Sequence, residues 1–174
     1  MSHQTTPNVD SIVAANESWV KDFKHGDLPL PPGKKYAIVT CMDARLPPTN
    51  PASLGIQPGD AHIIRNAGGS AVDGLRSLLI SQHLLGTEEV LVIKHTGCGM
   101  LTFQDADIKG LIKERQGEEA SKEVEGTEFL PFPELKEAVR GDVQFLRDNK
   151  ALKEKAKISG WIWEVETGAL KRVV

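Results

Sequence analysis

Three short apolar segments alternate with longer amphipathic ones along the chain. The short segments follow loops or turns containing Pro or Gly, and they are Tyr36–Thr40, Ala61–Ile64 and Val90–Ile93. Two of them are continuously apolar and rich in β-branched residues, which is typical of strands buried on both faces of a parallel sheet. The pattern therefore predicts three strands of one central sheet.

Apolar residues at helical spacing lie between and around these strands. One such segment runs from Ser70 to Leu85, and Ser70 and Asp73 at its start have the spacing of a capping box. A second helix is predicted after Pro133, and a third over about residues 8–24. The alternation predicts an α/β fold with a mainly parallel central sheet of about four to five strands flanked by helices.

Two further segments complete the expected organisation. Residues 157–165 have the pattern of a strand that a turn can connect to residues 170–174 in a hairpin. Residues 116–127 are polar, acidic and bounded by Gly, which predicts a surface loop. Because no linker, repeat or second core is visible, we expect residues 1–174 to form a single domain.

Composition narrows the class of protein. With 40% hydrophobic and 26% charged residues, the chain is expected to fold as a soluble globular protein, and no apolar run approaches the length of a spanning helix. The net charge of −3 gives no reason to expect nucleic-acid binding. The first residues lack the features of a secretory signal, so we expect a cytoplasmic protein that does not bind membranes.

The only two cysteines follow strands of the predicted sheet. Cys41 ends the first apolar segment, and Cys98 follows the third together with His95. Ligands bind at the carboxyl ends of parallel strands in open α/β sheets. Two thiolates and one imidazole suit zinc, and three protein ligands leave a fourth position for water, as at catalytic sites. The alternative is that both cysteines are merely buried small hydrophobic residues.

Asp43 and Arg45 lie directly after Cys41. Alternate positions can point the same way, so Arg45 can pair with Asp43 and keep it ionised. A carboxylate beside the metal could then accept a hydrogen bond from a bound water or hydroxide and orient it. The alternative is an ordinary surface ion pair. A zinc site with two thiolates is formally neutral, so its water should be less acidic than at a three-His site, which predicts higher activity above neutral pH.

Three motifs in this order resemble those of the β-class carbonic anhydrases, in particular their compact branch. They are Cys41-Met42-Asp43-Ala44-Arg45, Ile64-Arg65-Asn66-Ala67-Gly68-Gly69 and His95-Thr96-Gly97-Cys98-Gly99. The likeness is good over about residues 36–100 and more diffuse on either side. It implies a zinc enzyme that hydrates CO2 to bicarbonate and a proton, with one zinc ion per chain.

The resemblance also implies roles for individual residues. Cys41, His95 and Cys98 would bind zinc, Asp43 would orient the zinc-bound hydroxide, and Arg45 would hold Asp43. The backbone N–H of Gly99 matches a position near the substrate. In some members the aspartate binds zinc in a resting state, and several of those carry a Trp three residues before the first Cys.

Two expectations about the state of the enzyme follow from the resemblance. Ile38 stands where those members carry Trp, which favours the open form with water on the metal. The family forms homodimers or higher homo-oligomers, with an N-terminal helix laid across the partner subunit. The apolar stripe within residues 8–24 fits that role, although such a stripe could equally pack on the chain's own core.

Three other functions remain open at this level. Relatives on the same fold hydrolyse carbon disulfide or carbonyl sulfide, and the zinc ligands do not distinguish them. A nucleotide-binding module could use the turn Asn66-Ala67-Gly68-Gly69-Ser70 at a helix N-terminus, although it lacks the spacing of either Gly-rich fingerprint. A non-catalytic zinc-binding protein is the third, but it would not need Asp43 and Arg45.

Overall fold

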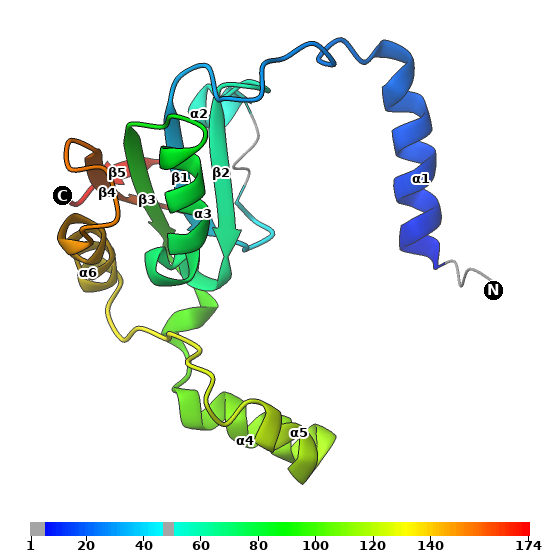
Figure 1. Ribbon diagram of the computed structural model, residues 1–174. Coiled ribbons are helices and arrows are strands. Elements are labelled where there is room, and N and C mark those ends of the chain that lie inside the picture. Colours follow the sequence, from blue (N-terminus) through cyan, green and yellow to red (C-terminus); the bar gives the residue numbers. More distant parts are fainter. Residues whose placement is uncertain (1–5, 47–50) are drawn as a thin grey trace.

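The computed structural model, described here for residues 6–46 and 51–174, has a five-stranded sheet in the order β2-β1-β3-β4-β5 (Figure 1). β1 pairs in parallel with β2 and β3, β3 pairs in parallel with β4, and β5 is antiparallel to β4. The mainly parallel α/β fold and the C-terminal hairpin predicted from the sequence are confirmed. The strands are β1 (Tyr36–Cys41), β2 (Ala61–Asn66), β3 (Glu89–His95), β4 (Lys157–Trp163) and β5 (Leu170–Arg172).

The helices connect and flank these strands. They are α1 (Pro7–Trp19), α2 (Pro51–Leu54), α3 (Ala71–His83), α4 (Asp105–Gln116), α5 (Glu118–Glu123) and α6 (Leu135–Asp148), with 3-10 turns η1 (Val20–Asp22), η2 (Ala67–Gly69) and η3 (Gly99–Leu101). The hydroxyl of Ser70 caps α3 by accepting the N–H of Asp73, as its spacing predicted. The surface-loop prediction for residues 116–127 is wrong in part, because residues 118–123 form α5.

The helix α5 was missed because its residues carry no apolar stripe. The six residues EEASKE are nearly all polar, so the periodicity that reveals a buried helix face is absent. Propensity and charge hold this short helix instead: two glutamates lie in its first turn and Lys122 lies in its last. The segment is nevertheless at the surface, as expected.

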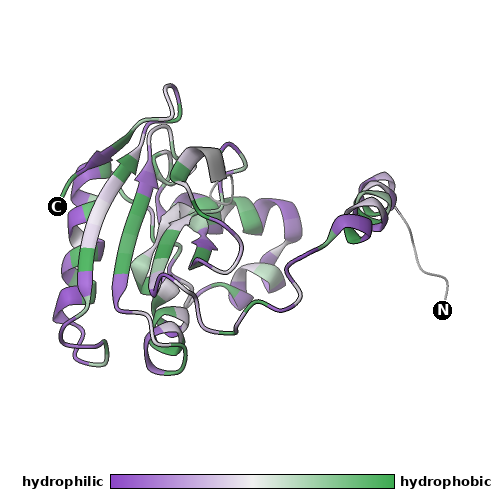
Figure 2. Cartoon of the chain, turned by 90° about the horizontal axis from the view of Figure 1, so that it is seen from above, coloured by the Kyte–Doolittle hydropathy of each residue, from purple (hydrophilic) through white to green (hydrophobic). Residues whose placement is uncertain are grey.

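The sheet has one face covered by helices and one face left partly open. α3 and α6 pack on the first, which we call the closed face, where Val39, Val92 and Leu78 have no exposed surface. On the second, the open face, Ile38 and Ile93 are buried, while neighbouring apolar residues remain partly exposed. Figure 2 shows the hydrophobic strands at the centre and the polar outer surfaces of the helices.

The first helix, α1, stands away from this body in both views (Figures 1 and 2). The apolar residues of its stripe and of the following turn are exposed: Val9, Ile12, Val13, Trp19, Val20 and Phe23. The helix begins with Thr6, whose hydroxyl accepts the N–H of Val9, so it is capped within its own sequence. In the described part of the chain, the helices are too short or too polar to cross a membrane.

Candidate metal centre

The two cysteines and one histidine meet at the carboxyl ends of β1 and β3. Cys41 is the last residue of β1 and His95 the last of β3, and the parallel pairing of these strands sets them side by side. Cys98 follows in the turn after β3. The sulfur and ring nitrogen atoms of the three residues lie within 4.8 Å of one another. The structure therefore brings together the three residues that the sequence singled out.

The donor atoms of this cluster are suited to a metal ion. All three side chains are buried, and Nδ1 of His95 lies 2.9 Å from the carbonyl of Thr96, which favours a proton on Nδ1 and a lone pair on Nε2. Among the described residues, His95 Nε2 has no hydrogen-bond partner. Two sulfurs held at about 2.3 Å from a tetrahedral zinc lie about 3.8 Å apart. The observed separation of Cys41 Sγ and Cys98 Sγ is 4.0 Å, so the cluster fits zinc.

The two cysteine side chains lie within hydrogen-bond reach of each other, with their sulfur atoms 4.0 Å apart. The hydrogen bond from Cys98 lowers the pKa of Cys41 to about 4, and backbone N–H groups of Asp43 and Gly68 lower it further. The same hydrogen bond raises the pKa of Cys98, and burial adds to that rise. These surroundings favour the thiolate form of Cys41. A metal ion that displaces the proton of Cys98 would then be bound by two thiolates.

Asp43 and Arg45 form a two-pronged ion pair beside the cluster. Arg45 donates from Nε and from its terminal nitrogen to the two carboxylate oxygens, at 3.0 and 2.7 Å, and its backbone N–H adds a third hydrogen bond. These bonds hold the pKa of Asp43 well below its usual range. Asp43 Oδ2 lies 3.7 Å from His95 Nε2, so the carboxylate faces the atoms that would bind a metal.

Further groups fix this pair in position. Arg45 also donates to the carbonyl of Gly97, which ties the loop after β1 to the loop after β3. Arg65, at the end of β2, donates to the carbonyls of Cys41 and Asp43 at 3.1 and 2.7 Å. Arg65 belongs to the second of the three sequence motifs, but the sequence alone indicates no role for it. The signal that could have found it is its position at the strand end beside β1.

Gly99 and the turn before α3 also have clear places in the structure. Gly99 is exposed and begins η3 directly after Cys98, and its N–H makes no hydrogen bond to a described residue. The turn at Gly68 is engaged rather than free for a nucleotide. The N–H of Ala71 donates to Asp142, and the side chain of Asn66 bonds to the backbone of Ser70 in both directions.

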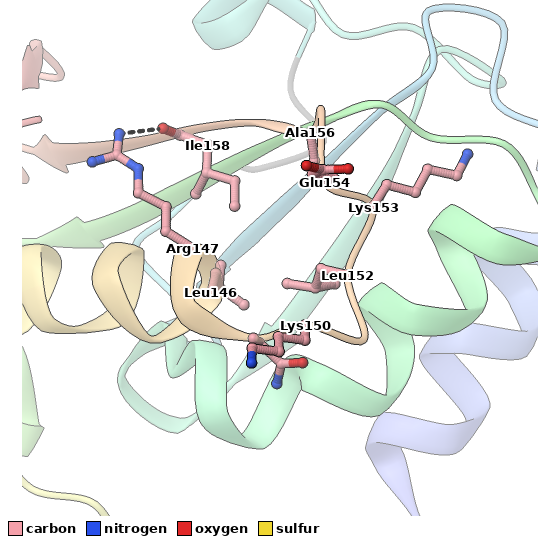
Figure 3. A pocket seen from close by; sticks show the side chains of 9 residues that line it. Leu146, Arg147, Lys150, Leu152, Lys153, Glu154, Ala156 and Ile158 are labelled. Atoms are coloured by element: carbon pink, nitrogen blue, oxygen red, sulfur yellow. Dashed lines mark hydrogen bonds between the residues drawn. The ribbon is translucent and has the colours of Figure 1, made fainter.

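A cavity of about 550 Å³ lies elsewhere, at the C-terminal end of α6 and the amino end of β4 (Figure 3). Leu146, Leu152 and Ile158 line its apolar part, and Arg147 is occupied by a hydrogen bond to the carbonyl of Ile158. The parallel strands carry the cysteines and the histidine at their other ends. This cavity therefore does not belong to the cluster.

The fold and the cluster together define an α/β protein with a buried Cys2His cluster that could hold a metal ion at the carboxyl edge of a mainly parallel sheet. A profile of the carbonic anhydrase family matches residues 36–170. β-Carbonic anhydrase 1 of Mycobacterium tuberculosis is 41% identical over 165 residues, which cover 94% of this chain and 96% of that protein. The chain belongs to the β-carbonic anhydrase family and is an enzyme of the carbonic anhydrase class.

Two other relatives mark the range of this similarity. The carbonic anhydrase of Glaciozyma antarctica is 48% identical, with a TM-score of 0.88 and all of both chains covered. A carbon disulfide hydrolase of Acidithiobacillus thiooxidans is 31% identical over 156 residues, covering 82% of this chain and 78% of that protein. The relatives of this chain thus include proteins named for two different activities, carbonic anhydrase and carbon disulfide hydrolase.

Proposed function

We propose that this enzyme catalyses the reversible hydration of CO2 to bicarbonate and a proton, with one zinc ion held by Cys41, His95 and Cys98. The observation that carries the proposal is the Asp43 carboxylate, paired with Arg45 and 3.7 Å from the free Nε2 of His95. When bound, zinc would supply a Lewis acid that makes water a nucleophile near neutral pH. A structural metal site would not require an oriented carboxylate beside it.

The protein's own residues would orient the reaction. Asp43 stays ionised because Arg45 stabilises its charge, so it accepts a hydrogen bond from the attacking oxygen and fixes the direction of the lone pair. Arg45 is itself anchored by the hydrogen bond that it donates to the carbonyl of Gly97. The unpaired N–H of Gly99 would donate to an oxygen of CO2 or bicarbonate. The pairing of Asp43 with Arg45 also supports the open form, in which Asp43 does not bind the metal.

Hydrolysis of carbon disulfide or carbonyl sulfide is the second candidate. It is favoured by the 31% identity to a carbon disulfide hydrolase over most of both chains. Both reactions begin with attack of an oxygen nucleophile on a linear, electrophilic carbon, so the residues described above would serve either. Assaying sulfide release from carbon disulfide beside CO2 hydration decides between the two.

Stopped-flow CO2 hydration by zinc-loaded enzyme tests the proposal. Asp43→Asn should retain about one zinc per chain and lose about 100-fold in kcat/KM, because the oxygen nucleophile is no longer held in one orientation. Cys98→Ser should lose both zinc and activity. Asp60→Asn is the matched control, since Asp60 also pairs with a cation, Lys34 at 2.8 Å, but in a turn at the other end of the sheet.

Each alternative has its own outcome in that experiment. Full CO2 hydration by Asp43→Asn would remove the role proposed for the carboxylate. Zinc-loaded enzyme that releases sulfide from carbon disulfide but does not hydrate CO2 would favour the second candidate. Zinc binding without either reaction would identify a non-catalytic protein. Activity that does not change between pH 6 and 9, a window chosen from the roughly neutral pKa of water on zinc, would contradict the expected alkaline preference.

We also propose that the enzyme is a homodimer or higher homo-oligomer in which α1 packs on a second copy of the chain. The exposed apolar stripe of α1, including Ile12 at 68% and Phe23 at 50% exposure, supports this. Ile12→Glu should shift the mass measured by light scattering towards the monomer. Leu111→Glu, a matched change on the exposed side of α4, should not. A monomeric wild-type enzyme would contradict the proposal.

A cytoplasmic location without nucleic-acid or membrane partners is also proposed. Its support is the chemistry of the cysteines, which are free and have sulfur atoms 4.0 Å apart. An oxidising compartment would favour a disulfide between them and remove two metal ligands. Location of a fluorescent fusion, together with the thiol count of the purified enzyme, tests it.

A further inference from the structure

Lys94 precedes the candidate ligand His95 but points to the other face of the sheet. Successive side chains of a strand alternate between faces, so His95 joins the cysteines while Lys94 enters the closed face beneath α6. Its side chain is only 3% exposed, which is rare for a lysine. A cation this deeply buried requires partners for its charge and for its three N–H donors.

The structure supplies three acceptors for the three donors of Lys94. Its ammonium lies 2.9 Å from Asp142 Oδ2 on α6, 2.9 Å from the carbonyl of Gly68 and 3.2 Å from that of Gly69. The ring of Phe132 covers it, with the centroid 4.8 Å away. Every proton of the ammonium is therefore used inside the protein, and the group joins β3 to α6 and to η2.

The carbonyls that Lys94 binds belong to a turn that contacts the ligand Cys41. Gly68 and Gly69 have φ of +70° and +59°, a left-handed backbone that turns both carbonyls towards Lys94. A Cβ placed on Gly69 would lie 2.9 Å from the backbone nitrogen of Cys41, so the turn packs directly on the end of β1. The same Cβ would lie 2.9 Å from the carbonyl carbon of Thr40, so η2 rests on the backbone that carries Cys41.

Asp142 compensates part of the charge of Lys94. Its carboxylate lies 2.9 Å from the lysine and also accepts the N–H of Ala71, the first residue of α3. The cation still acts on Cys98, because it lowers the pKa of that thiol against the larger rise that the hydrogen bond from Cys41 causes. A cation near the site opposes the binding of Zn²⁺ by repulsion, whereas a group that holds a ligand in place strengthens it, so the two effects of Lys94 have opposite signs.

We propose that Lys94 is a positioning residue of the metal centre: by binding the carbonyls of Gly68 and Gly69, it holds η2 against the backbone of Cys41. The inference rests on the zinc site of the proposed function and extends it to the closed face of the sheet. Removing groups that hold metal ligands in position weakens binding by about 10–100-fold in other metalloproteins.

Substitution of Lys94 by Met, followed by loading with Co²⁺ or Zn²⁺, tests the inference. The change keeps the length of the side chain and removes its donors. Without Lys94, η2 no longer holds the backbone of Cys41 in place, so the Co–S geometry should change and the thiolate-to-cobalt charge-transfer band should move. Zinc should dissociate about tenfold faster into a chelator.

Val143→Ala is the matched control for lost stability. Val143 is buried on the same helix beside Asp142 and takes no part in the hydrogen bonds of Lys94, so it should lower Tm without moving the band. Asp142→Asn keeps an acceptor oxygen for Lys94 and should move the band less than Lys94→Met. This variant carries the test if Lys94→Met does not fold.

The outcomes separate this inference from the proposed function. An unmoved band with unchanged zinc release in Lys94→Met would overturn the positioning role, even if the enzyme hydrates CO2 normally. Tighter zinc binding in that variant would overturn it too, since it would show that the lysine acts through its charge. Wild-type protein that binds zinc but does not hydrate CO2 would leave the inference standing and remove the proposed reaction.

Discussion

The closed face of the sheet is covered by helices of the same chain, whereas the open face is not fully covered. On the closed face, α3 and α6 cover Val39 and Val92 fully, and the chain supplies its own core. On the open face, Tyr36, Leu91 and Trp161 stay partly exposed, and a groove of about 280 Å³ runs along the strands. The cysteines and the histidine belong to this second face.

Within a single strand, residues that stabilise the fold alternate with residues on the side of the cluster. Along β3, Val90 and Val92 pack under α3 and α6, whereas Ile93 lies on the same face as His95. A reactant needs access, which a face covered by helices would deny. Residues on the closed face should therefore change the free energy of unfolding, whereas those near the cluster should change metal binding and rate.

The largest effect is expected at the cluster itself. His95→Gln removes the Nε2 ligand, so bound zinc should be lost and CO2 hydration should fall to the uncatalysed rate. Metal content by atomic emission and stopped-flow hydration measure this. His62→Gln is the control, because His62 lies in β2 with Nδ1 2.7 Å from Ser81 and faces no cluster. Zinc retained at wild-type affinity in His95→Gln would contradict the assignment.

The next effect concerns the closed face. Leu78→Ala on α3 removes a side chain with no exposed surface and should lower the free energy of unfolding by about 3 kcal/mol. Denaturant unfolding of the zinc-free protein measures it. Zinc affinity should stay unchanged, because Leu78 contacts the core rather than the cluster. A large loss of zinc affinity here would mean that the two faces are not separable.

A smaller effect is expected for the same kind of change on the open face. Leu91→Ala removes a partly exposed side chain from the rim of the groove, so less apolar surface is lost from the interior. The expected loss in free energy of unfolding is about 1 kcal/mol. If the loss in the oligomer matches that of Leu78→Ala, then a partner covers this face.

The smallest effect is a pH shift that reports on the open face. Tyr36 is the only tyrosine, and burial raises its pKa above the ordinary value of 10.0. The folded state therefore holds this proton more tightly than the unfolded state. The resulting stability is complete below pH 10.0 and is lost as the pH rises through the folded pKa. Phenolate absorbance during titration measures it, and an unshifted titration would mean that this position is open to water.

Some of the structure could be predicted because its signals are local. The strand ending at Cys41 is visible in its apolar run, and a hydroxyl at Ser70 marks the start of α3. The metal cluster could be inferred because parallel strands end at one edge, which places Cys41 beside His95. α5 could not be inferred from periodicity, since a helix without a buried face has no apolar stripe.

The sequence by itself determined that two thiols, an imidazole and the pair Asp43 and Arg45 lie at the carboxyl ends of two strands. It ended the second of these strands at Ile93, whereas β3 continues to His95. Only the tertiary structure decided which groups surround Lys94 on the closed face of the sheet. The acceptors of Lys94 come from η2 and α6, which are far apart along the chain, so no local sequence pattern predicts them. A buried charge is stable only where distant segments supply its partners, and folding alone brings those together.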